Sequence, residues 1–350
     1  MKKARLFFQL VGIGIFTISL VIVGCTKDGP MGPAGADGKD GVDGIDGQDG
    51  TTSCLACHNT TVETTVNAQY ESSTHGGSQN FYPGSPLVSE YAGARNDCAK
   101  CHSHEGFLET QKTGRDTTAA NIPIPTNITC NTCHESHASF DFETDGQDYA
   151  LRTAIPVALL IDKNSTIDFG NTSNLCANCH QPRTGPTVPD GDGNFEITSF
   201  RYGPHHSPQA TMVAGIAGYE TLTGEYPTAG TSTHATAGSC ILCHMVEKDN
   251  VSSHDWVPTI ESCTECHTSL TTFDYNGFQT KIQGMLDELK ADLTNAGLLD
   301  AEGTTIVGTY PAEHAGALYN YKTILEDQSL GVHNPRYTEA LLEASLAIFD

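Results

Sequence analysis

Apolar residues recur at helical spacing in the last part of the chain. Five of them follow the i, i+3, i+4, i+7, i+11 pattern that places side chains on one helix face: Ile282, Met285, Leu286, Leu289 and Leu293. Gly297 follows as a residue able to end this helix. A second helix is predicted from about Pro311 to Asp327, with three residues facing inward: Leu318, Tyr321 and Leu325.

A third helix is predicted at the end of the chain. Asn334 and Pro335 have the residue types of an N-cap and of a first-turn proline, and the apolar residues Leu341, Leu342 and Leu346 continue the pattern. The helical segment therefore begins near residue 277. We expect its apolar stripes to pack against one another and against whatever fills the rest of the molecule.

The preceding 200 or so residues show no comparable periodicity. Segments such as "GPTVPDGDGNFEITS" and "AGTSTHATAGS" are rich in turn-forming residues, and no strand-rich region stands out. Hydrophobic residues make up 38% and aromatic residues 7% of the chain, a thin supply for the core of a protein this long. The pattern predicts loops and short helices that pack around something other than protein.

A five-residue motif, C-x-x-C-H, occurs six times in this loop-rich part. The copies are "CLACH" (Cys54, Cys57, His58), "CAKCH" (Cys98, Cys101, His102), "CNTCH" (Cys130, Cys133, His134), "CANCH" (Cys176, Cys179, His180), "CILCH" (Cys240, Cys243, His244) and "CTECH" (Cys263, Cys266, His267). They use twelve of the thirteen cysteines, and a histidine follows every second cysteine. Such regular repetition indicates one kind of site built six times.

The residue types of the motif indicate covalently attached haem. C-x-x-C-H is the attachment signature of c-type haem, in which two thiols bond to the porphyrin and the adjacent histidine ligates its iron. A zinc ribbon has no need of a histidine after every cysteine pair, and ferredoxin cysteines lie closer together. We therefore predict six c-type haems in a multihaem cytochrome fold, mostly irregular with α-helices, wrapped around a haem stack. Porphyrin faces would then supply the missing apolar surface.

Each haem iron has a second axial position, and the histidine count allows all six to be filled. Nine histidines lie outside the motifs: His75, His104, His137, His205, His206, His234, His254, His314 and His333. Six are predicted as distal ligands: His75, His137, His205, His234, His254 and His333. His137 extends its motif to C-x-x-C-H-x-x-H, a pattern typical of ligation to a neighbouring haem. His205 is preferred to the adjacent His206, while His104 and His314 are the alternatives.

The N-terminus has the features of an export signal. Lys2, Lys3 and Arg5 precede an apolar stretch from Leu6 to Val23, and the stretch ends "IVGC", resembling the lipobox of bacterial lipoproteins. Residues 1–24 are then a lipoprotein signal peptide and Cys25 is the lipidated residue. The alternative is an uncleaved transmembrane anchor, which eighteen fairly apolar residues would barely allow. Position 26 is Thr rather than Asp, so the common signal for retention in the inner membrane is missing.

A glycine-repeat segment links the lipid to the haem domain. Glycine falls at every third position from Gly29 to Gly50, the pattern of a collagen-like Gly-X-Y repeat. The run is short and acidic, which favours a tether over residues 25–50; a trimerising stalk is the alternative. The hexahaem cytochrome domain is then predicted to span residues 51–350.

With these motifs in view, the chain resembles the outer-surface multihaem cytochromes of metal-respiring bacteria, some of which form filaments. The resemblance rests on the lipobox, the six motifs, the histidine surplus and the segments "YGPHHSPQ" and "GVHNPRY". The helix after "HNP" is also similar to the C-terminal helix of the multihaem nitrite reductase group. Those nitrite reductases use a C-x-x-C-K motif with a lysine ligand, and this sequence contains none.

The resemblance implies an extracellular electron carrier rather than an enzyme. It places the protein in the outer membrane as a lipoprotein facing the cell exterior, with the periplasmic face as the alternative. The runner-up function is a reductase of nitrite, hydroxylamine or a sulfur oxyanion, which would require one haem without a sixth ligand.

The net charge of the chain indicates which classes of molecule it can bind. The net charge is −24, and loss of the three basic residues of the signal peptide would bring it to −27. Nucleic acid is therefore excluded as a partner, while metal cations and basic surfaces of redox proteins are favoured. We expect extracellular metal acceptors and other multihaem cytochromes or a porin–cytochrome conduit as partners. A spare histidine would also permit a homopolymer.

Overall fold

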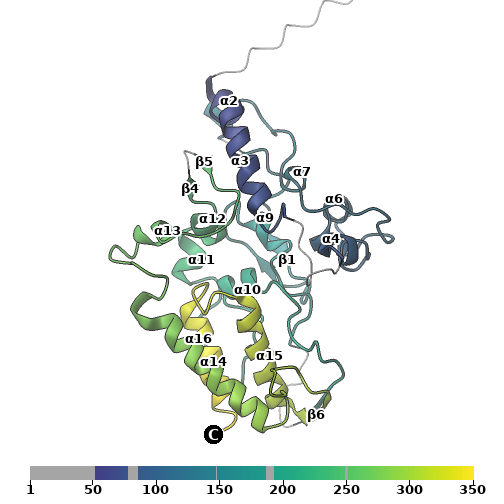
Figure 1. Ribbon diagram of the computed structural model, residues 1–350, viewed down its shortest axis with the longest axis vertical. Coiled ribbons are helices and arrows are strands. Elements are labelled where there is room, and N and C mark those ends of the chain that lie inside the picture. The colour runs from purple at the N-terminus through teal and green to yellow at the C-terminus, as the bar shows by residue number, and fades with distance from the viewer. Residues whose placement is uncertain (1–51, 78–85, 147, 187–192, 249–250) are drawn as a thin grey trace, which may run out of the picture. The chain divides into compact units, whose positions relative to one another are not determined.

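Short helices joined by long irregular connections form most of the chain in the computed structural model (Figure 1). The structure describes residues 52–77, 86–146, 148–186, 193–248 and 251–350, all within one compact unit, Thr52–Asp350. The signal peptide, Cys25 and the tether predicted for residues 1–50 lie outside the described residues. The predicted fold class, mostly irregular with α-helices, is confirmed.

The helices of the first half are short except for α3 and α6. Their bounds are α2 Thr52–Cys57, α3 Thr60–Ser72, α4 Val88–Tyr91, α5 Ala99–His102, α6 His104–Thr113, α7 Cys130–Cys133 and α8 Phe142–Asp145. The middle of the chain continues with α9 Asn174–Ala177, α10 Gln209–Ala214, α11 Thr233–Ala237, α12 Ser239–His244 and α13 Glu261–Thr264. Helices this short are not stable alone in water, so other contacts must hold them in place.

The described strands form three small antiparallel pairs. Strand β1, Val157–Ala158, pairs with β2, Thr166–Ile167, and β4, Glu247–Lys248, pairs with β5, Val251–Ser252. The longest pair joins β3, Asn194–Ile197, to β6, Gly308–Pro311, with Phe195 opposite Tyr310. Pairs of this size close loops rather than build a sheet, as the absence of strand patterns in the sequence predicts.

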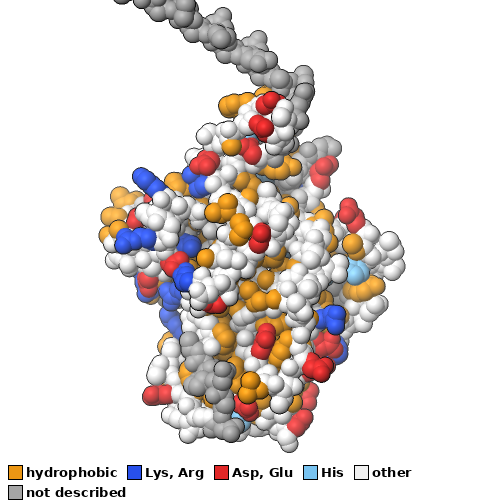
Figure 2. Space-filling model, turned by 180° about the vertical axis from the view of Figure 1, so that it is seen from behind, with side chains coloured by type: hydrophobic (Ala, Val, Ile, Leu, Met, Phe, Trp, Pro, Cys, Tyr) orange, Lys and Arg blue, Asp and Glu red, His pale blue; other side chains and the backbone are white. Residues whose placement is uncertain are grey.

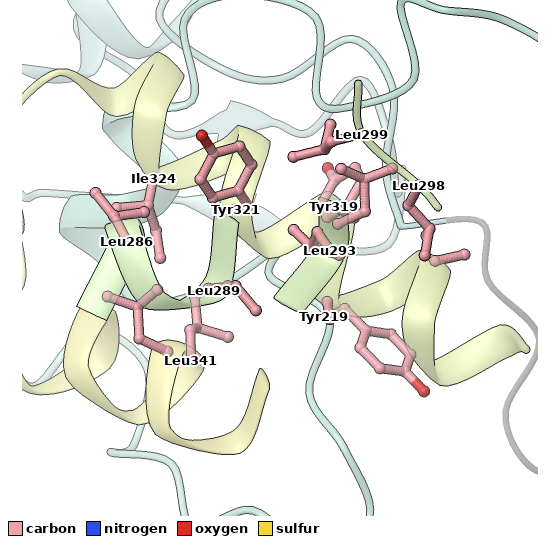
Figure 3. Packing of buried hydrophobic residues seen from close by; sticks show 14 of the residues in the cluster. Tyr219, Leu286, Leu289, Leu293, Leu298, Leu299, Tyr319, Tyr321, Ile324 and Leu341 are labelled. Atoms are coloured by element: carbon pink, nitrogen blue, oxygen red, sulfur yellow. The ribbon is translucent and has the colours of Figure 1, made fainter. Parts of the chain in front are cut away.

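The C-terminal part holds the longest helices and the main apolar core. A 3-10 turn, η1 Tyr275–Gly277, leads into α14, Phe278–Asn295, which packs with α15, Ala312–Asp327, and α16, Pro335–Leu346. Figure 3 shows side chains of these helices converging on one cluster. Ile282, Leu286, Leu289 and Leu293 are almost fully buried there, as their spacing predicts.

The predicted helix ends are confirmed in detail. The Asn334 side chain accepts a hydrogen bond from the Tyr337 backbone N–H, and Pro335 is the first residue of α16. Gly297 lies just beyond α14 with φ of 79°, a left-handed conformation that glycine adopts without strain. These local signals were sufficient because each acts within a few residues.

The prediction that Leu325 faces inward is wrong. Leu318 and Tyr321 are buried, but Leu325 is 41% exposed. Most of α15 is buried on several sides at once, from Ala312 to Ile324, so its buried positions do not form the single stripe that the spacing assumed. Ile324 enters the core in place of its neighbour (Figure 3).

Apolar surface outside the C-terminal helices is less completely covered. A second cluster is small and consists of Val157, Leu159, Ile167, Ala177, Ala210 and Ala214. Several large apolar side chains are exposed, among them Ile124 at 82% and Leu222 at 87%. The space-filling view shows hydrophobic side chains reaching the surface along the middle of one face (Figure 2). No helix in the described part of the chain is both long and apolar enough to cross a membrane.

Candidate haem sites

Each of the six motifs forms a single helical turn. The histidine backbone N–H donates to the carbonyl of the first cysteine in five of them, for example from His58 to Cys54 at 2.8 Å and from His180 to Cys176 at 3.0 Å; the sixth, Cys240–His244, lies within α12. A turn of this kind places two cysteines and a histidine around one point. The ten motif cysteines from Cys98 to Cys266 carry no disulfide, so their thiols remain available for attachment.

Every motif histidine faces one other histidine. The ring centres are 6.1 Å apart for His58 and His137, 6.5 Å for His102 and His205, 6.2 Å for His134 and His254, 6.0 Å for His180 and His75, 6.3 Å for His244 and His333, and 6.4 Å for His267 and His234. The six partners are the same six histidines that local sequence context favours as distal ligands.

The separation fits one metal ion between each pair. Imidazole nitrogen lies about 2 Å from a metal it ligates, so two nitrogens on opposite sides of one ion are about 4 Å apart. Half a ring on each side brings the ring centres to about 6 Å. Aromatic rings in direct contact have centres anywhere from about 4.5 to 7 Å apart, so the indication of a common metal ion is the narrow spacing repeated in all six pairs.

The donor set fits a cofactor that brings its own ligands. Within the described residues, no group of three or more histidine, cysteine, aspartate or glutamate side chains is placed to hold a metal ion. A structural zinc site needs four protein ligands, and the histidines here meet only in pairs. Haem supplies four nitrogens of its own and needs two axial ligands and two thiols, which is what each site offers. The residues present therefore fit haem.

A large cavity runs between the motifs. Its volume is about 2960 Å³, and residues of five motifs line it, from Cys98 to His267. Cavities of roughly 300–1,000 Å³ hold one small ligand, so this one has room for several. Five of the histidines predicted as distal ligands also line it: His75, His205, His234, His254 and His333.

Hydrogen bonds orient many of the paired rings. The Nδ1 atoms bond to Tyr149 O (His134, 3.0 Å), Asp148 Oδ1 (His137, 2.6 Å), Gln209 Oε1 (His180, 3.2 Å), Val332 O (His234, 2.5 Å), Trp256 O (His244, 2.8 Å), Ser252 O (His254, 2.8 Å) and Asp327 Oδ1 (His333, 2.6 Å). A bonded Nδ1 leaves Nε2 as the nitrogen available to ligate a metal and restrains the plane of the ring.

Burial keeps several of these imidazoles neutral, the form that binds metal. Burial, together with the charge of neighbouring His180, lowers the pKa of His75 to about 4. Burial and the adjacent His206 lower the pKa of His205 to about 4 as well. His333 differs: burial acts to lower its pKa, but the buried Asp327 carboxylate outweighs this and raises it.

The three remaining histidines do not face a motif histidine in this way. His104 Nδ1 bonds to Thr132 Oγ1 at 2.8 Å, His206 Nδ1 pairs with Glu326 at 2.8 Å, and His314 packs against Phe349 with ring centres 4.7 Å apart. The structure thus brings the preferred six opposite the motifs and leaves the alternatives His104, His206 and His314 with other contacts.

Some of the C-x-x-C-H motifs are in contact with one another. The Cys101 thiol lies 4.0 Å from the Asn178 carbonyl oxygen, and the Cys179 thiol lies 3.8 Å from the Lys100 carbonyl oxygen. The Cys240 backbone N–H also donates to Ser173 Oγ at 3.1 Å, just before the fourth motif. The fourth motif therefore lies against both the second and the fifth, an arrangement that spacing along the chain does not reveal.

Several residues that contact the paired histidines or the motif cysteines were not predicted from the sequence. Asp148, Gln209 and Asp327 bond to ligand candidates, and Arg183 Nη1 lies 3.5 Å from Cys98 Sγ. Trp256 contacts three histidines of different pairs. Only Trp256 carried a signal in the sequence, because it is the single tryptophan of the chain.

Comparison with solved structures identifies the fold. The chain is similar to the outer cell wall cytochrome OcwA, with a TM-score of 0.52 and 22% identity over 81% of this chain and 50% of that one. It is also similar to an undecaheme cytochrome from the S-layer of Carboxydothermus ferrireducens, with a TM-score of 0.47 and 17% identity over 83% of this chain and 46% of that one.

The chain spans about half the length of these structures. No protein-family model matches it, and no curated protein sequence does. The predicted resemblance to outer-surface multihaem cytochromes is confirmed at the level of the fold: this chain folds like a cytochrome of the outer cell wall.

Proposed function

We propose that the chain is a hexahaem c-type cytochrome that transfers electrons outside the cell. The observation that carries the proposal is the set of six histidine pairs with ring centres 6.0–6.5 Å apart, each including the histidine of a C-x-x-C-H motif. Haem iron, when bound, supplies reversible one-electron chemistry. The chain would contribute the thioether attachments, both axial ligands and an apolar enclosure.

Two histidines at every site favour a carrier over an enzyme. An enzyme of the multihaem reductase type needs an open axial position where substrate reaches the iron. Here each proximal histidine faces a second imidazole, and seven of the twelve rings have Nδ1 hydrogen-bonded, which holds Nε2 toward the pair. With both axial positions filled, small oxyanions would have no place to bind.

Contacts between the C-x-x-C-H motifs support electron transfer from one haem site to the next. The second and fourth motifs are in contact, and Cys240 of the fifth motif is hydrogen-bonded to Ser173, just before the fourth. We propose that electrons pass along this network to extracellular metal acceptors or to partner cytochromes, including a porin–cytochrome conduit. Lipidation of Cys25 would anchor the protein in the outer membrane, and residues 25–50 would tether the haem domain to it. Because the six pairs form within one chain, a homopolymer would not depend on ligands exchanged between copies.

The ferric EPR spectrum should report six low-spin sites in two groups. The planes of the paired rings are nearly perpendicular in four pairs, at 74° for His58–His137 and 86° for three others, and are less tilted in two, at 33° and 41°. Perpendicular imidazole planes give highly anisotropic signals with a large g value, and more parallel planes give rhombic signals. We expect four of the first kind and two of the second.

The same sample should carry six haem masses above the mature polypeptide by intact mass spectrometry, which verifies that every site is loaded. A strong high-spin signal in a fully loaded sample would contradict bis-histidine ligation and favour the reductase.

Acceptor specificity separates the carrier from the reductase directly. Reduced protein mixed with a soluble ferric chelate in a stopped-flow instrument should be oxidised rapidly, because electron transfer needs only close approach to a haem edge. Nitrite and hydroxylamine should oxidise it slowly or not at all, since each needs an open iron. Stoichiometric conversion of nitrite to ammonia would overturn the carrier assignment.

A further inference from the structure

Trp256 lies where three histidine pairs meet. Its ring centre is 4.5 Å from that of His75 in an edge-to-face arrangement at 86°, and 5.7 Å from that of His254 at 66°. Its backbone carbonyl accepts a hydrogen bond from His244 Nδ1 at 2.8 Å. These three histidines belong to different pairs, with His180, His134 and His333 respectively.

The turn that carries Trp256 is held from both sides. The Asp255 carboxylate accepts hydrogen bonds from Ser253 Oγ at 2.7 Å and from the Val257 backbone N–H at 2.9 Å. Lys248 Nζ, on the neighbouring strand β4, donates to Asp255 Oδ2 at 2.7 Å. These hydrogen bonds restrict the backbone conformation of Trp256.

The backbone of Trp256 is strained. Its φ is 54°, in the left-handed region that is unfavourable for a bulky residue. Such a conformation costs on the order of 1–3 kcal/mol and persists only where the surroundings enforce it, which is often at functional sites. Because glycine or asparagine would adopt this φ more easily, the turn itself gives no reason for a tryptophan. The reason must lie in what the indole ring contacts.

The indole contacts two imidazoles through their rings rather than through a hydrogen bond. The Nδ1 bonds that orient seven of the paired rings within the described residues do not include one from His75. Its ring instead lies edge to face against the indole, a contact that can set its plane. His254 has such a bond, to the Ser252 carbonyl, and its backbone N–H donates to Gln69 Oε1. Trp256 would therefore matter more for the plane of His75 than for that of His254.

We propose that Trp256 is a positioning residue that fixes the ring planes of His75 and His254 and so couples two neighbouring haem sites. The proposal rests on the proposed function, since it assigns the residue a role toward bound haem. The ring planes of the axial ligands determine the EPR anisotropy of each low-spin site, which makes the role measurable without any turnover assay.

Trp256→Leu removes the ring and keeps an apolar side chain. In the fully loaded protein, we expect two of the six EPR signals to shift. One is a large-g signal, from the site of His75 and His180, and the other is a rhombic signal, from the site of His134 and His254. The site of His244 and His333 should not change, because its contact is to the Trp256 backbone.

Tyr275→Leu provides the matched control. The Tyr275 ring centre lies 4.2 Å from that of His267, in a single pair with His234. Its removal should shift one large-g signal and no rhombic signal. Trp256→Phe provides the conservative variant: the smaller ring should keep the nearer contact, so the signal of the His75 site should stay and that of the His254 site should shift.

The outcomes separate the two proposals. Fewer than six haems, or high-spin signals, in the unaltered protein would refute the proposed function whatever the variants show. Six normal low-spin signals that Trp256→Leu leaves in place would refute the positioning role alone. If Trp256→Leu fails to load its haems, Trp256→Phe decides: a spectrum equal to that of the unaltered protein refutes the role, and a shift confined to the rhombic group supports it.

Discussion

Replacing His333 with alanine should convert one haem site from low spin to high spin and leave the other five unchanged. His333 faces His244 with ring centres 6.3 Å apart, and its Nδ1 bonds to Asp327 Oδ1 at 2.6 Å. The histidines outside the six pairs make other contacts, His206 with Glu326 and His314 with Phe349. No described histidine is therefore placed to replace the lost ligand. Ferric EPR and the high-spin absorption band would measure the change.

The substitution should also reduce stability. Asp327 is 2% exposed, and without His333 its carboxylate would keep the Ser329 hydroxyl as a partner but lose the imidazole. A buried acceptor that loses a partner costs about 1–3 kcal/mol. His314→Ala is the matched control, because it removes a partly exposed histidine that packs on Phe349 and should leave all six signals in place. An unaltered spectrum in the His333→Ala protein would remove His333 from the ligand set and bring His104 or His314 back into consideration.

A chain without haem should lose most of its structure outside the C-terminal helices. Replacing the twelve motif cysteines with alanine prevents attachment. We expect the amides of α14, α15 and α16 to remain protected from hydrogen exchange, while those around the motifs exchange nearly as fast as in an unfolded chain. The control is the haem-loaded protein, in which both parts should be protected.

The physical reason is the distribution of buried apolar surface. The main cluster is built largely from α14, α15 and α16, whereas the second cluster contains only six buried residues, three of them alanines. Five of the six motifs line a cavity of about 2960 Å³. Burial stabilises by about 25 cal/mol per Å² of apolar surface, so under the proposed function most of that contribution around the motifs would come from contact with porphyrin. Uniform protection of the haem-free chain would contradict this account, and so would uniform loss.

Local sequence signals predicted the C-terminal helices well. Asn334, Pro335 and Gly297 act at positions where capping and backbone geometry depend on the nearest few residues. Leu325 shows the limit of such signals: its spacing is that of a buried position, but the neighbours of α15 decide which of its faces are covered. Burial is a tertiary property, and periodicity predicts it reliably only when one face is packed.

The C-x-x-C-H motifs could also be recognised from the sequence alone. Each one needs two cysteines and a histidine on one helical turn, and five consecutive residues supply all three. The prediction of six sites, each with a covalently attached haem, therefore rests on these short segments alone. The choice of six distal histidines from nine also came from local context, and those six lie opposite the motif histidines in the folded chain.

Which distal histidine faces which motif depends on the path of the folded chain. His234 lies six residues before Cys240 but faces His267, and His75 faces His180 across more than a hundred residues of chain. Irregular connections have no period from which their path could be calculated, so the approach of two distant rings cannot be inferred from spacing. The same holds for Trp256, whose role depends on three histidines brought to it by separate loops. The prediction of haem attachment at each motif needs only five adjacent residues, because the groups it involves are local. The pairing of the histidines arises from contacts between distant segments and exists only once the chain has folded.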